Sequence, residues 1–82
     1  MKERNFGDVY RKIVEIAPEE LKEKLENRLC FAAPELVWSV LSRCVNNTII
    51  PSSKDPLAIK IYAILCDCSD EEMKARFESD GI

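Results

Sequence analysis

The segment from Pro56 to Cys68 constrains the fold of this chain more than any other, because very little of its surface can face water. It carries only two charged residues, Lys60 and Asp67, and at 100° per residue both fall on one narrow strip of a helix. Apolar residues occupy the remaining roughly 260° of arc. A helix of this kind is buried on nearly all sides, so the rest of the chain has to pack around it.

Two amphipathic helices are expected in the first third of the chain. From Phe6 to Ala17 apolar residues recur every three or four positions, and this helix must end before Pro18 because the residue before a proline is pushed out of helical geometry. A second helix begins at Pro18 and continues to about Cys30, with acidic residues in its first turn, where they favour the helix dipole. Its leucines form only a narrow stripe, which predicts a helix on the surface.

The third and fifth helices in chain order complete the predicted set, since the segment that begins at Pro56 is the fourth. One begins at Pro34 and continues to about Asn47, with apolar side chains over roughly 200° of its circumference. The other is short: Ser69 precedes Glu72 by three residues, the spacing of a capping box, and Gly81 suits its end. The fold class predicted is therefore all-α, a compact bundle of about five short helices within a single domain, 1–82. The third and fourth helices are expected at its centre.

The charge balance argues against nucleic acid as a partner. The 82 residues include 12 basic and 15 acidic side chains, a formal net charge of −3. Nucleic-acid binding depends on clustered Lys and Arg that neutralise phosphates, so no nucleic-acid role is expected. No apolar run approaches the roughly 18 residues that span a bilayer, and the N-terminus has no secretory signal pattern. We therefore expect a cytoplasmic protein with reduced cysteines and no membrane partner.

The residue types present also argue against catalysis. The chain contains no histidine, which is the commonest general base and the commonest transition-metal ligand, and its only glycines are Gly7 and Gly81, too few for a phosphate-binding loop. The carboxylates lie on predicted solvent faces or at helix starts. We therefore expect no enzymatic activity, no cofactor and no small-molecule substrate.

The four cysteines leave one alternative open. Cys30, Cys44, Cys66 and Cys68 could supply the four thiolates of a structural zinc site. Their spacing is poor for this, because two ligands would come singly from two helices, and Cys66 and Cys68 point about 160° apart on a regular helix. Reduced cysteine more often packs as a small apolar side chain. A cysteine-ligated zinc domain is thus the second hypothesis, behind cysteines as core residues.

A protein-protein interaction module is the first hypothesis. The third and fourth helices have more apolar surface than the three other short helices can cover. We therefore expect part of it to bind another chain, through Trp38, Ile59, Tyr62 and Ala63. A homodimer is the simplest way to cover it, and the substitution Ala63→Glu should then split the dimer. An adaptor, or an inhibitor of the kind found among small phage and plasmid proteins, has this general build.

Overall fold

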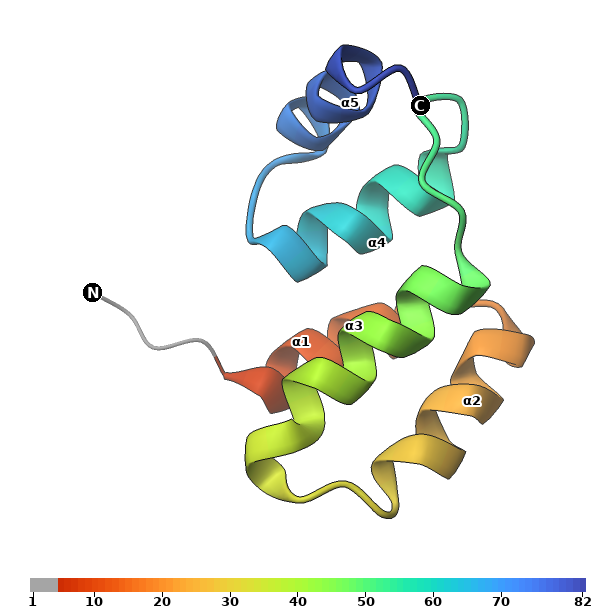
Figure 1. The fold of residues 1–82 in the computed structure, drawn as a ribbon, viewed down its shortest axis with the longest axis vertical. Helices are drawn as coiled ribbons and strands as arrows, with labels where there is room; N and C mark the ends of the chain where they lie inside the picture. Colours follow the sequence, from red (N-terminus) through yellow and green to blue (C-terminus); the bar gives the residue numbers. More distant parts are fainter. Residues whose placement is uncertain (1–4) are drawn as a thin grey trace.

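A computed structural model of the chain describes residues 5–82. Within that range, all the regular secondary structure is helical. The α-helices are α1 (Phe6–Ile16), α2 (Glu19–Leu29), α3 (Val37–Thr48), α4 (Pro56–Cys66) and α5 (Asp70–Ser79), and a short 3-10 helix, η1 (Pro34–Leu36), precedes α3. The described residues form no β-strand. The predicted all-α fold with five short helices is confirmed (Figure 1).

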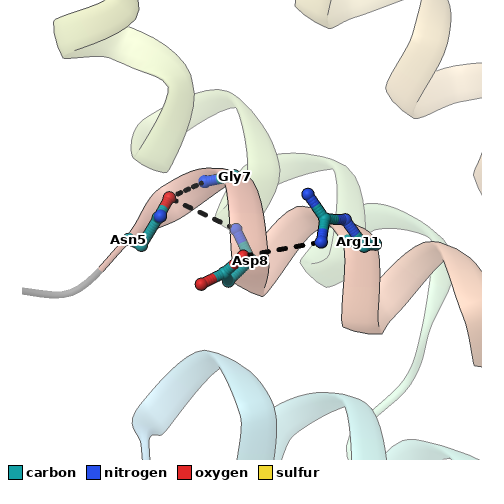
Figure 2. Close-up of polar contacts among 4 residues, drawn as sticks. All are labelled: Asn5, Gly7, Asp8 and Arg11. Carbon is teal, nitrogen blue, oxygen red and sulfur yellow. Dashed lines mark hydrogen bonds and ion pairs between the residues drawn. The ribbon is translucent and has the colours of Figure 1, made fainter.

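The start of α1 is fixed by a side-chain cap. The Oδ1 atom of Asn5 accepts hydrogen bonds from the backbone N–H groups of Gly7, at 3.0 Å, and Asp8, at 3.4 Å (Figure 2). These are two of the donors that a helix leaves without partners in its first turn. The Oδ1 atom of Asp8 also lies 3.8 Å from Nη1 of Arg11, one turn later in the helix. This ion pair is exposed and contributes little energy. The helix gives way to extended backbone at Ala17, directly before the proline, as predicted.

The third predicted helix begins with a tighter turn than expected. Pro34 opens a 3-10 turn in which the N–H of Leu36 donates to the carbonyl oxygen of Ala33 at 2.8 Å, and the α-helical pattern begins only at Val37. No side chain caps this start, because Ala33 has no acceptor to offer. Short 3-10 turns are frequent at the ends of α-helices, and this one forms part of the connection from α2 to α3.

The fourth predicted helix ends two residues earlier than expected. Asp67 leaves α4 in the left-handed conformation, with φ of 56°, so Cys68 is no longer helical. The N–H of Cys68 donates to the carbonyl oxygen of Ala63 at 3.0 Å, and that of Asp67 to Ile64 at 3.4 Å. This pair of bonds is a Schellman motif, in which two terminal carbonyls of the helix are satisfied by the reversing chain.

The last helix has both ends predicted from the sequence. The Ser69 hydroxyl oxygen accepts a hydrogen bond from the N–H of Glu72 at 3.2 Å, which caps the start of α5. Gly81 then turns the chain with φ of +78°, and the N–H of Ile82 donates to the carbonyl oxygen of Phe77 at 2.8 Å. Glycine suits this position because it lacks the Cβ that makes positive φ costly.

The helices are arranged so that α1 connects the two halves of the fold. The main neighbours of α3 are α2 and α1, whereas those of α4 are α5 and α1. Figure 1 shows α4 and α5 at one end of the molecule and α2 toward the other. The molecule is flat, with extents of 35 × 34 × 20 Å. The two helices predicted to be central therefore share α1 as a common neighbour.

The core contains mainly aliphatic side chains, and α4 contributes more of them than any other helix. Its members are Val9, Ile13, Ala17, Leu21, Leu25, Leu41, Cys44, Val45, Ile49, Ala58, Ile61, Tyr62, Ala63, Leu65, Met73 and Phe77. The strongly apolar character of α4 thus has the predicted consequence of burial. Among residues 5–82, no helix has both the length and the apolar character that crossing a membrane requires.

Candidate functional site

A groove lies between α2 and α3 and is the best-defined hollow with a distinctive chemistry. It has a volume of about 310 Å³. We call it the α2–α3 groove. Its lining residues are Lys24, Arg28, Leu36, Ser39, Val40, Arg43, Cys44 and Asn47.

Helical spacing places the lining residues along the groove. In α2, the buried residues Leu21 and Leu25 direct one side of the helix to the core, and Lys24 and Arg28 lie one turn apart beside that side. In α3 the lining positions recur from η1 onward at intervals of three and four residues, adjacent to the buried Leu41. The groove therefore runs along η1 and α3 and is bordered on the α2 side by a single helical turn.

The charge of the groove is opposite to that of the whole chain. Three of its lining residues, Lys24, Arg28 and Arg43, are cationic and exposed, and none of its lining residues is acidic, although the net charge of the protein is −3. Neither arginine forms an ion pair within the described part of the chain. The Nζ atom of Lys24 lies 3.8 Å from Oε1 of Glu20, one turn earlier in α2. Such an exposed pair is weak and can be exchanged for another carboxylate.

Another surface of α2 is mainly acidic. Glu19, Glu20, Glu23 and Glu26 lie with Lys22 around a shallow surface that is separate from the groove. Acidic residues thus predominate on this surface of α2, whereas Lys24 and Arg28 line the groove beside α3. A field of this kind repels an anionic partner from one side of the helix and attracts it to the other.

The groove combines apolar and cationic side chains. Leu36 and Val40 supply apolar surface, and the Cys44 side chain is buried beside them. Within residues 5–82 no polar or charged residue is buried, so the cations stand at the rim of the groove in contact with water. An apolar strip with a charged, solvated rim is the composition of a protein-protein interface.

A second hollow, of about 720 Å³, is more open and lies where the start of α1 meets the end of α2 and the start of α3. Its lining includes Phe6, Tyr10, Leu29 and Val37, with Glu26 at its edge. Burial raises the pKa of Tyr10, and the charge of Glu26 and a smaller effect of Cys30 act in the same direction. Among the described residues its lining is mainly apolar and includes no cation.

The four cysteines do not come together. Cys30 is exposed at the end of α2, Cys44 is buried in α3, Cys66 is exposed and Cys68 is half-buried after α4. In the part of the chain that the structure describes, no three His, Cys, Asp or Glu side chains are grouped so that they could hold a metal ion. Burial raises the pKa of Cys68, although the nearby Arg76 lowers it in part. The arrangement required for a four-thiolate zinc site is therefore not formed.

Two of the four residues expected at a partner surface lie in the core of the protein itself. Ala63 is 1% exposed and Tyr62 is 9% exposed, because α1 and α5 pack against the apolar surface of α4. Trp38 and Ile59 are half-buried. The ring of Trp38 contacts that of Phe6 in a tilted arrangement, with centroids 5.5 Å apart, and so also packs within the chain. Ala63 and Tyr62 are therefore covered by other helices of the same chain.

The most exposed large apolar residues, Phe31, Ile50 and Leu36, lie in or beside the connections between α-helices. Phe31 is 92% exposed in the link from α2 to η1, and Leu36 is 53% exposed at the end of η1, where it lines the groove. Sequence reasoning missed both residues and all three groove cations. The available signal was a phenylalanine in a loop, outside the periodic pattern of any helix, followed by "APEL".

Comparison with known proteins does not assign the chain to a class: no protein-family model matches it, and no curated protein or solved structure is significantly similar to it.

Proposed function

We propose that this protein is a small binding module that acts as an adaptor or inhibitor by occupying the surface of another protein. The observation that carries the proposal is the α2–α3 groove, in which apolar side chains lie inside a rim of three cations. A large apolar side chain that is almost fully exposed, Phe31, lies in the link between α2 and η1, the two elements that carry Arg28 and Leu36 of the groove. Aromatic anchors with arginine neighbours are typical of the residues that dominate interface energies.

Self-association is the second form of this proposal. It is supported by the half-buried Trp38 and Ile59, which remain from the surface predicted by the sequence. A twofold contact through the groove would bring Lys24, Arg28 and Arg43 close to their own copies, and like charges at an interface are unfavourable. We therefore favour a different protein over a second copy.

The native mass spectrum under reducing conditions, without chelator, distinguishes these possibilities. A metal-free monomer is expected. A dimer would support the surface of Trp38 and Ile59, and a mass increment of zinc would revive the cysteine-ligated hypothesis despite the separation of the thiols.

Site-specific photocrosslinking tests the binding surface directly. A benzoylphenylalanine at Ser39, which is exposed in the groove, should give a discrete crosslinked product in cells that make the protein, whereas the same group at the exposed Lys60 on α4 should not. The product should be lost with Leu36→Ser and retained with Ile50→Ser. Ile50 is 80% exposed and does not line the groove, so it controls for the loss of an exposed apolar side chain. Equal products from both crosslinking positions, or none from Ser39, would contradict the proposal.

A further inference from the structure

We infer that the occupant of the α2–α3 groove is an acidic amphipathic helix of another protein. This inference rests on the proposed function and specifies its partner. It follows from the length of the groove, the distribution of its charges and the apolar side chains of Leu36 and Val40 in its lining.

The length of the groove suits a helix. Along η1 and α3 its lining extends from Leu36 to Asn47, a separation of 11 residues and about 16 Å at ~1.5 Å per residue. A partner helix of about three turns covers that distance, since each turn rises ~5.4 Å. A partner helix could lie along α3 where α2 packs against it, which is the helix-in-groove mode of recognition.

The chemistry of the groove specifies the sequence of the partner. Leu36 and Val40 can pack against apolar residues that recur every three or four positions in the partner helix. Lys24 and Arg28 from one wall, and Arg43 from the other, then face the flanks of that helix. Asp or Glu at those flanks would complement the cations. The apolar residues supply the affinity, and the rim charges select the partner and speed its approach.

Other occupants fit these observations less well. Sites for small anions use fixed polar groups inside the pocket, whereas here no polar or charged residue in the described range, 5–82, is buried. Three cations on a chain of net charge −3 provide too little positive surface for nucleic acid. A second copy could offer its acidic α5, but the apolar residues of that helix, Met73 and Phe77, are already buried against the core.

Three synthetic 16-residue peptides, each labelled with fluorescein, test the inference by fluorescence anisotropy. The first has leucines on one helical face and glutamates at its flanks. The second replaces the glutamates with lysines, and the third replaces the leucines with serines. We expect binding of the first peptide, with affinities at least about tenfold weaker for the other two. Raising the salt concentration should weaken binding of the first peptide, because screening acts on exposed charges.

Protein variants locate the binding. Arg43→Glu should weaken binding of the acidic peptide at least about tenfold, while Lys60→Glu, which makes the same charge change on the exposed side of α4, should leave it within about twofold. Arg43 is exposed, so the fold should survive its replacement, and Arg43→Gln gives a milder second variant if it does not. Circular dichroism of each variant verifies the helix content.

Each contrary outcome has its own meaning. Equal binding of the acidic and basic peptides, or equal losses for Arg43→Glu and Lys60→Glu, would overturn the inference. So would binding of the serine peptide as strong as that of the leucine peptide. If no peptide binds while the Ser39 crosslink persists, the acidic-helix inference fails and the proposed function stands. If the crosslink is also absent, both fail.

Discussion

The hydroxyl group of Tyr62 donates a hydrogen bond of 2.7 Å to the backbone carbonyl oxygen of Ile49. This bond joins the middle of α4 to the residue that follows α3, thirteen positions earlier. The ring of Tyr62 also meets that of Phe77 in α5 edge to face, with centroids 5.6 Å apart. One side chain thus connects three separate segments in the core.

The substitution Tyr62→Phe should lower the free energy of unfolding by about 1 to 2 kcal/mol. It leaves the ring contact in place but removes the donor from a buried carbonyl group, and an unsatisfied buried acceptor costs about that much. Urea denaturation followed by circular dichroism measures the change. Tyr10→Phe is the matched control, since the Tyr10 hydroxyl forms no hydrogen bond within the described residues; an equal loss in both variants would argue against the bond to Ile49.

The stability of the protein should fall in alkaline solution, partly through Tyr62. Burial raises the pKa of Tyr62 above its ordinary value of 10.0, and the neighbouring Cys66 adds to this effect. The unfolded chain therefore loses the proton first, so the contribution is fully present below about pH 10 and is lost as the pH rises further. Urea midpoints between pH 8 and 11.5 should decline more steeply for the native protein than for Tyr62→Phe. Parallel declines would show that other groups, including Tyr10, dominate.

A glycine in place of Asp67, at the end of α4, should stabilise the protein. Asp67 has a positive φ, which costs a residue with a Cβ about 1 kcal/mol, and its negative charge lies at the unfavourable end of the helix dipole. We expect Asp67→Gly to raise the free energy of unfolding by about 0.5 to 1 kcal/mol.

Gly81→Ala is the reciprocal test at the end of α5. A Cβ at Gly81 would meet no atom within 4 Å, so the expected loss of about 1 kcal/mol comes from the backbone conformation alone. Thermal melts of both variants check the two predictions, and a stabilised Gly81→Ala would contradict the role assigned to positive φ.

Ala63→Glu should unfold the protein and not merely separate two copies. The side chain of Ala63 is almost completely buried, and an unpaired carboxylate in an apolar core costs several kcal/mol. Helix content measured by circular dichroism should collapse in this variant and persist in Lys60→Glu, which alters an exposed position of the same helix. An Ala63→Glu protein that stays folded but changes from a dimer to a monomer would instead support the interface predicted from the sequence.

Glu20→Gln should strengthen binding of the acidic peptide about two- to threefold. Glu20 lies 3.8 Å from Lys24 and competes with any carboxylate that approaches this cation, so its neutralisation leaves Lys24 available to the partner. Glu23→Gln is the control, because it makes the same charge change on the acidic side of α2. Fluorescence anisotropy compares the two, and equal gains would mean that net charge, and not the pairing with Lys24, controls affinity.

The sequence alone determined where the helices lie, because helix starts and ends depend on neighbours within about four residues. Ser69 and Gly81 could be assigned from their own residue types and spacing, and the prolines stopped or opened helices for steric reasons that need no tertiary contact. Even here, the left-handed turn at Asp67 was missed, since aspartate is not the residue that this conformation favours.

Only the tertiary structure decided which apolar surface is covered and which charges meet. Ala63 lies in the core because α1 and α5 pack on α4, and nothing in the residues around position 63 reveals those neighbours. Arg28 and Arg43 belong to different helices and line one groove because α2 packs along α3. Burial and charge clustering depend on contacts between segments that are distant in the chain, and helical periodicity describes only one segment at a time.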